Sequence, residues 1–296
     1  MKENHRLIKV ESYTVPTLDD KIRLSDFPAG TFNTIHSRKA FKNAIKLGLI
    51  NVNREIGFTA DYISGGELIE IFQNPDAQKK PVIDFPVDVI FEDDYLAIVF
   101  KPSGIVVSGN KKFTLENALS YNLKKTTQED ALLSPEPIHR LDYPTSGALL
   151  VGKTSESLIA LNRMFEEKEI QKTYHAVTIG NMKDSGIITL DVDNKKSKTR
   201  FKIIHQKESR KYTCLNLVEL TPFTGRKHQL RIHLASIDTP ILGDKIYGSP
   251  GLIGQGNGLY LHASSLKFIH PITDENVSVT IPLPKKFIKL FPEINL

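Results

Sequence analysis

The residues best suited to chemistry are a carboxylate and a cation that lie two positions apart. Asp142 follows Arg140 within residues 138–153, a segment that continues with a turn signal and a short apolar run. A charged pair in such a position is typical of a reactive or binding site. The plainer alternative is that Asp142 caps a turn, because aspartate is a common turn residue. Taken by itself, the pair leaves both interpretations open.

The residues after Asp142 predict how it is positioned. Residues 148–151 are Ala-Leu-Leu-Val, a short apolar run of the kind that forms a buried strand. Pro144 and Gly147 interrupt the chain just before this run. We therefore expect Asp142 in a loop that leads into a sheet, and functional residues are concentrated in such loops.

The same segment resembles a family signature. His-Arg-Leu-Asp at residues 139–142, Thr-Ser-Gly at 145–147 and an apolar run followed by Lys153 resemble the signature of the RluA family of RNA pseudouridine synthases. The resemblance implies that Asp142 is the catalytic residue and that Arg140 takes part in handling the RNA. Pseudouridine formation breaks the bond between ribose C1′ and uracil N1 and rejoins the base through C5. Because no redox change occurs and no external group is consumed, we expect no cofactor.

Two later segments extend the resemblance. Residues 172–180 alternate with a period of two, which predicts a strand. They resemble the family motif Lys-x-Tyr-x-Ala-x-x-x-Gly, whose tyrosine, here Tyr174, stacks on the target base. Residues 224–233 resemble the motif Thr-Gly-Arg-x-His-Gln-x-Arg-x-His. In that motif the second arginine, here Arg231, pairs with the catalytic aspartate, and the next residue, Ile232, helps to wall the base pocket.

Pairing of Asp142 with Arg231 has a physical reason. A carboxylate in a buried site must stay ionised for this chemistry, yet desolvation raises its pKa. A guanidinium group within contact distance opposes that effect. The sequence leaves open whether the carboxylate attacks the sugar, adds to the base or removes a ribose proton.

For residues 87–296 the resemblance implies an α+β catalytic domain built on a mixed, largely antiparallel sheet. Strand-like runs at residues 87–91 and 96–100 begin this domain, and Thr114 is expected to cap a short helix. One lysine and one later cluster of basic residues each allow two interpretations. Lys101 either lies near the RNA or is a solvated lysine at a strand end. The basic cluster within residues 195–202 either follows a phosphate backbone or is simply solvated.

The residues before this domain are expected to form a lead-in at 1–20, a small module at 21–74 and a linker at 75–86. A helix capped by Ser37 and ended by Gly48 is predicted, with an apolar stripe of Ala40, Phe41, Ala44, Ile45 and Leu47. Together with residues 45–53 and 65–67, this helix resembles an S4 domain, a small α/β RNA-binding module. The resemblance implies phosphate contacts from four basic residues, which could otherwise form an ordinary solvated face: Arg38, Lys39, Lys42 and Lys46.

The composition limits the class of protein. A chain of 296 residues with 40% hydrophobic and 25% charged residues is typical of a globular protein of one or two domains. The net charge of +5 favours a polyanionic partner without requiring one. The single cysteine, Cys214, excludes an internal disulfide and a multi-thiolate zinc site, and its apolar neighbours indicate a small filler in a strand. No histidine pair combines metal-ligand spacing with acidic partners, so we expect no metal.

The predicted function is isomerisation of specific uridines in structured RNA by Asp142. Large-subunit ribosomal RNA is the more common substrate of family members with an S4 domain. Transfer RNA as substrate and a non-catalytic RNA-binding protein of the same fold are the alternatives. An unrelated hydrolase is disfavoured, because no second carboxylate lies in a comparable motif and no Gly-x-Ser-x-Gly elbow is present. Without a membrane-spanning run or a signal peptide, we expect a cytoplasmic protein, most simply a monomer.

Overall fold

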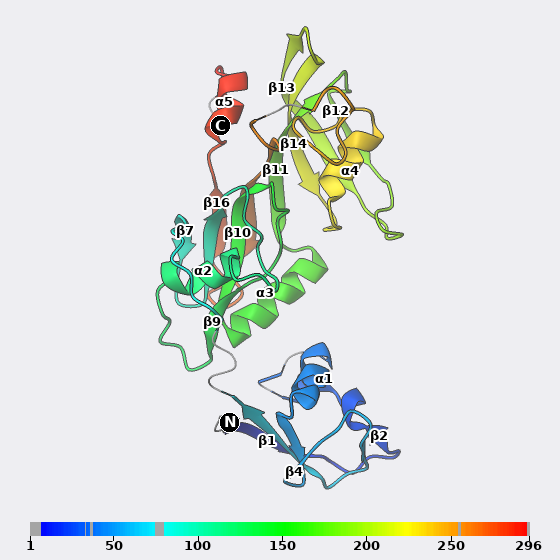
Figure 1. The fold of residues 1–296 in the computed structure, drawn as a ribbon, viewed down its shortest axis with the longest axis vertical. Coiled ribbons are helices and arrows are strands. Elements are labelled where there is room, and N and C mark those ends of the chain that lie inside the picture. The colour runs from blue at the N-terminus through cyan, green and yellow to red at the C-terminus, as the bar shows by residue number, and fades with distance from the viewer. Residues whose placement is uncertain (1–6, 33, 36–37, 75–79, 254–255, 295–296) are drawn as a thin grey trace. The chain divides into compact units, whose positions relative to one another are not determined.

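The computed structural model describes residues 7–32, 34–35, 38–74, 80–253 and 256–294. The chain divides into two compact units, Met1–Lys80 and Pro81–Leu296, each with its own hydrophobic core. Figure 1 shows the elements of each unit. Within the described residues, none of the helices is long and apolar enough to span a membrane.

The first unit is built on a small antiparallel sheet in the strand order β1-β6-β3-β4. The strands of the unit are β1 (Ile8–Thr14), β3 (Ile50–Val52), β4 (Glu55–Ile56) and β6 (Leu68–Gln73), and a separate pair is formed by β2 (Ile22–Arg23) and β5 (Tyr62–Ile63). Two short 3-10 helices precede the single α-helix of the described unit: η1 (Leu24–Asp26), η2 (Ala29–Thr31) and α1 (Arg38–Lys46).

The expectation of a lead-in at residues 1–20 is wrong for β1, which pairs with β6 from Ile8 to Thr14 with one register shift between Lys9 and Glu11. The reason is visible in its burial. Ile8 and Val10 alternate with Lys9 and Glu11, but both apolar side chains are exposed and none of the seven residues is fully buried, so the strand is held by backbone pairing and not by a buried face. Tyr13 anchors it by packing its ring against Phe27 and Phe32, with 5.9 Å between ring centroids in both cases.

Helix α1 is present, with a narrower buried stripe than expected. Phe41, Ala44 and Ile45 are buried, whereas Ala40 and Leu47 are exposed. Gly48 adopts φ +68° directly after the helix, a conformation that glycine tolerates without steric cost. The predicted cap, Ser37, lies outside the described residues.

The second unit contains a ten-stranded sheet, and its order confirms the mixed, largely antiparallel α+β fold. All neighbouring strands are antiparallel except β10 and β15, which run parallel at Ser146 and Gly147. In sheet order the strands are β12 (Ser185–Ile188), β13 (Thr199–Ser209), β14 (Thr213–Pro222), β11 (Gln171–Ile179), β15 (Leu261–Ile269), β10 (Ser146–Thr154), β8 (Leu96–Lys101) and β7 (Val89–Glu92), with β16 (Asn276–Thr280) beside β15 and β9 (Ala131–Pro137) beside β10.

Helices pack against both faces of this sheet. They are α2 (Leu115–Asn122), α3 (Ser155–Glu167), α4 (Gln229–Ser236) and α5 (Lys285–Leu290). Every residue of β10 is buried, because Leu150 packs into one core cluster and Leu149 into another on the opposite face.

Thr114 caps α2 as expected by accepting a hydrogen bond from the Asn117 amide at 3.2 Å. Cys214 is buried in β14, as its neighbours predicted.

Gly147 explains why a glycine precedes the apolar part of β10. Its φ is +127°, and a Cβ atom there would lie 2.2 Å from the carbonyl oxygen of Ala263 on β15. Only glycine allows the two parallel strands to approach this closely. The start of β10 is thereby fixed against β15, and the loop that carries Asp142 ends at this point.

Candidate active site

Asp142 lies in the loop between β9 and β10, as predicted, and a buried lysine holds this loop in place. The Lys101 ammonium group donates hydrogen bonds to the carbonyl oxygens of Pro102 at 3.0 Å, Tyr143 at 3.3 Å and Thr145 at 2.7 Å. Lys101 is fully buried, so the solvated strand-end interpretation is wrong. Its contacts with the residues on both sides of Pro144 instead assign it to the support of the Asp142 loop.

Arg231 lies on helix α4, which follows β14 in the chain, and its side chain contacts Asp142. Its Nη1 donates to Asp142 Oδ2 at 3.2 Å. A second carboxylate, Asp244, accepts two hydrogen bonds from the same guanidinium group, from Nε at 2.7 Å and from Nη2 at 2.8 Å. The side chain of Arg231 is 3% exposed and that of Asp244 is fully buried, whereas Asp142 is 23% exposed. Arg231 therefore bridges a buried carboxylate and one that solvent or substrate can reach.

The charges in this network stabilise one another. Burial lowers the pKa of Arg231, but the hydrogen bonds and charges of Asp244 and Asp142 outweigh it and leave the pKa above its usual value. Burial raises the pKa of Asp244, and the hydrogen bonds from Arg231 and from the amides of Ile246 and Tyr247 reverse that effect, so its pKa lies below the usual value. Both groups are ionised at neutral pH.

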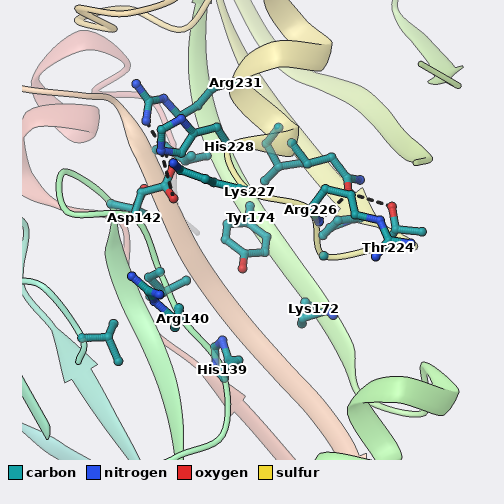
Figure 2. A pocket seen from close by; sticks show the side chains of 18 of the residues that line it. His139, Arg140, Asp142, Lys172, Tyr174, Thr224, Arg226, Lys227, His228 and Arg231 are labelled. Carbon is teal, nitrogen blue, oxygen red and sulfur yellow. Dashed lines mark hydrogen bonds and ion pairs between the residues drawn. The ribbon is translucent and has the colours of Figure 1, made fainter. Parts of the chain in front are cut away.

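Tyr174 projects from β11 into the same pocket, which is a cavity of about 730 Å³. Figure 2 shows its ring between Asp142 on one side and Thr224 and Arg226 on the other. Burial and, to a smaller extent, the negative charge of Asp142 raise the pKa of the Tyr174 phenol. The tyrosine therefore enters the site as a protonated phenol with an apolar ring. The structure thus brings Asp142, Tyr174 and Arg231 together in one pocket, from three segments far apart in the chain.

His228, which belongs to the same motif as Arg231, is a further neighbour of Asp142. Its Nε2 lies 3.7 Å from Asp142 Oδ1, and its Nδ1 lies 3.0 Å from the Tyr247 hydroxyl. The residue has φ +57° and immediately precedes α4. Burial lowers its pKa, and the charge of Asp142 offsets part of that effect.

Two residues expected at the substrate differ in their placement. Arg140 lines the pocket and is exposed, next to Asp142 in Figure 2. Ile232, in contrast, is half-buried and does not line the cavity, whereas Leu230 and Leu261 are among the apolar residues that do. Successive residues turn by about 100° around a helix, so Ile232 points away from the side of α4 that carries Leu230.

The basic residues expected to contact RNA through the first unit lie on α1. Arg38 pairs with Asp26, and the ammonium of Lys42 lies 3.7 Å from the same carboxylate. Lys46 is exposed at the end of the helix. The side chain of Lys39 lies outside the described residues.

The second basic cluster, Lys195, Lys196, Lys198, Arg200 and Lys202, is exposed at and before the start of β13. Lys198 and Arg200 lie 5.2 and 5.9 Å from the ring centroid of Phe223, which is itself 38% exposed. Both interpretations of this cluster therefore remain compatible with its position. No group of three or more His, Cys, Asp or Glu side chains suited to a metal ion occurs in the described part of the chain.

This fold and this pocket define a class of RNA-modifying enzyme. Residues 95–236 match the model of the family described as RNA pseudouridylate synthase. The chain is 31% identical over 278 residues to "Ribosomal large subunit pseudouridine synthase C" of Vibrio vulnificus, covering 83% of this chain and 84% of the relative. It is 28% identical over 283 residues to "Ribosomal large subunit pseudouridine synthase D" of Xanthomonas campestris, covering 86% and 83%.

A solved structure agrees in fold. The chain resembles "Human RNA Pseudouridylate Synthase Domain Containing 1" with a TM-score of 0.56 and 24% sequence identity, over 67% of this chain and 84% of the human one. The chain belongs to the RNA pseudouridylate synthase family. It is an enzyme that converts uridine in RNA to pseudouridine.

Proposed function

We propose that this protein converts uridines of large-subunit ribosomal RNA to pseudouridine with Asp142 as the catalytic carboxylate. One observation carries the assignment of Asp142. It is a partly exposed carboxylate in the pocket, and it contacts a guanidinium group that a second, fully buried carboxylate already holds. The names of the relatives support ribosomal RNA as the substrate, since both are called large-subunit synthases.

The contacts of Asp142 suit the chemistry of base isomerisation. Its Oδ2 accepts a hydrogen bond from Arg231, and its 23% exposure leaves it open to the sugar and base of a bound uridine. Nucleophilic attack on C1′, addition to the base and removal of a ribose proton all need a carboxylate oxygen that faces the substrate. Arg231 therefore serves each of these routes in the same way.

A uridine must leave its stack before Asp142 can reach it, at a cost of about a few kcal/mol. We assign two side chains to this step. Stacking on the Tyr174 ring recovers part of the cost, because base–aromatic stacking contributes roughly 1–3 kcal/mol. Arg140, exposed at the rim of the pocket, fills the space that the base vacates.

For the first unit we propose an S4-like role in RNA binding. Its support is the resemblance of residues 37–67 to that module and the exposed basic residues of α1. Because Arg38 is already paired with Asp26, we assign more of the phosphate contact to Lys46. These contacts position the RNA without reading its sequence.

Mapping pseudouridines in total RNA tests the choice of substrate. Cells with and without the protein are compared by chemical detection of pseudouridine at single-nucleotide resolution. Loss of one or more sites in large-subunit ribosomal RNA is expected, with transfer RNA unchanged. Loss confined to transfer RNA would contradict the proposed substrate while leaving the reaction assigned.

A further inference from the structure

A cation in the pocket has no part in the chemistry described so far. Lys172 lies on β11 two residues before Tyr174, so both side chains point to the same face of the strand. Both line the cavity, and Figure 2 shows Lys172 on the other side of Tyr174 from Asp142. Lys172 therefore faces whatever the pocket binds, at a position beyond the base that stacks on Tyr174.

The surroundings of Lys172 leave its charge uncompensated. Its Nζ lies 4.9 Å from the centroid of the Phe165 ring, a contact that offers only the weak attraction of an aromatic face. In the part of the chain that the structure describes, no side chain or carbonyl oxygen forms a hydrogen bond or ion pair with this nitrogen. Burial lowers the pKa of Lys172, and no described carboxylate offsets that effect. A half-buried lysine in this state is stabilised when an anion binds next to it.

His139 adds a neutral neighbour to the same wall. Its ring stacks on Phe165, with 4.8 Å between centroids, and its Nε2 accepts a hydrogen bond from the Leu150 amide at 3.1 Å. The neutral ring therefore carries its proton on Nδ1. Burial, together with the charge of Lys172, lowers the pKa of His139 to about 3, so the ring stays neutral at physiological pH. This end of the pocket thus provides cationic and neutral groups, and the described wall residues 139, 165 and 172 include no carboxylate.

We propose that Lys172 binds a backbone phosphate of the RNA next to the nucleotide whose base stacks on Tyr174. Two residues along a strand span roughly 7 Å, which suits the step from a base to a neighbouring phosphate. This inference rests on the proposed function, since it takes RNA as the ligand and Tyr174 as the stacking residue. This contact positions the RNA backbone in the pocket without selecting the base, because a phosphate carries no sequence information.

The salt dependence of RNA binding tests this assignment. Wild-type protein and Lys172→Gln are titrated with an unmodified transcript of large-subunit ribosomal RNA at several KCl concentrations. Loss of one phosphate contact is expected to weaken binding about tenfold at low salt and to reduce the slope of log K against log [KCl] by about 0.7–0.9. Lys172→Arg keeps the charge and is expected to keep the slope.

A matched control separates a local effect from the loss of any positive charge. Lys183 is exposed beyond the other end of β11, and Lys183→Gln is expected to leave both affinity and slope as in the wild type. Single-turnover rates at saturating RNA should fall less than about threefold in Lys172→Gln, because a phosphate contact is made equally in the ground and transition states.

The possible results have distinct meanings. An unchanged slope with a large loss of single-turnover rate would overturn the phosphate assignment and indicate a contact to the uracil instead. An unchanged slope with unchanged rate would also overturn it. If the wild type modifies transfer RNA transcripts and not the ribosomal transcript, the proposed substrate fails, and the same slopes measured on the transfer RNA then decide the role of Lys172.

Discussion

Arg231 is bound more tightly to Asp244 than to Asp142. Two hydrogen bonds of 2.7 and 2.8 Å join Arg231 to Asp244, whereas a single one of 3.2 Å joins it to Asp142. The guanidinium group is therefore oriented by a carboxylate that substrate cannot reach. Its remaining nitrogen, Nη1, donates a single hydrogen bond to Asp142. The Asp142 carboxylate is partly exposed and can therefore contact a substrate.

This arrangement predicts a large effect at Asp244. Asp244→Ala leaves the nearly buried guanidinium group of Arg231 without its main partner, so the free energy of unfolding should fall by roughly 3–5 kcal/mol. Urea denaturation followed by circular dichroism measures the change. Arg231→Ala leaves the buried carboxylate of Asp244 without its main partner, so this variant should lose a similar amount of unfolding free energy. A loss below about 1 kcal/mol in both variants would contradict a buried, structural pair.

The prediction for Tyr174 follows from its protonated phenol. Because the pKa is raised by burial and by Asp142, the hydroxyl does not act as a phenolate base at neutral pH, and the ring carries the function. Tyr174→Phe should retain the single-turnover rate within about threefold. Tyr174→Leu should bind RNA roughly tenfold or more weakly, because stacking is lost. A Phe variant as inactive as one lacking Asp142 would instead place the hydroxyl in the reaction.

Lys101 should matter through the loop that it holds. Lys101→Met removes hydrogen bonds to three carbonyl oxygens and is expected to cost about 2–4 kcal/mol of unfolding free energy. The single-turnover rate should fall at least about tenfold, with little change in RNA affinity, because displacement of Asp142 affects only the reaction. The exposed Lys112→Met serves as the control. Equal stability of the two variants would contradict this role.

The parts of this protein that could be predicted are those whose signal is local. The apolar run of β10, the cap at Thr114 and the turn at Gly48 each depend on a few neighbouring residues, and each was found where expected. The approach of Asp142, Tyr174 and Arg231 depends on the whole sheet, and only the family resemblance made it predictable.

Other features depend on tertiary structure and left little signal in the sequence. Strand β1 pairs through its backbone and exposes most of its side chains, and the alternation of Ile8 and Val10 with Lys9 and Glu11 is too short to mark a strand by itself. Burial of Lys101 is decided by three carbonyl groups that the fold brings to it. Asp244 becomes the partner of Arg231 only because the loop between α4 and β15 returns to the site. Ile232 does not line the cavity, because the turn of α4 directs its side chain away from the side that carries Leu230.

Acid stability offers a test of a different buried group. His262 is fully buried, its Nδ1 lies 3.0 Å from the Ser146 hydroxyl, and burial followed by the charge of His175 lowers its pKa to about 4. Between pH 6.5 and 4 the unfolded chain takes up a proton that the folded protein does not. This residue should therefore reduce stability by about 1.4 kcal/mol for each unit that the pH falls in that window.

The measurement is urea denaturation at pH 7, 6 and 5 for the wild type and His262→Asn. The variant should lose the contribution of His262 to this pH dependence, whatever its stability at pH 7. If the free energy of unfolding changes with pH by the same amount in the two proteins, His262 does not contribute the predicted pH dependence.

The role of Asp142 is tested most directly by Asp142→Asn in a single-turnover assay of pseudouridine formation, with RNA affinity measured in parallel. Because Arg231 remains paired with Asp244, the variant should fold as stably as the wild type within about 1 kcal/mol. We predict no pseudouridine above background, with RNA affinity within about threefold of the wild type. A rate within tenfold of the wild type would contradict the account.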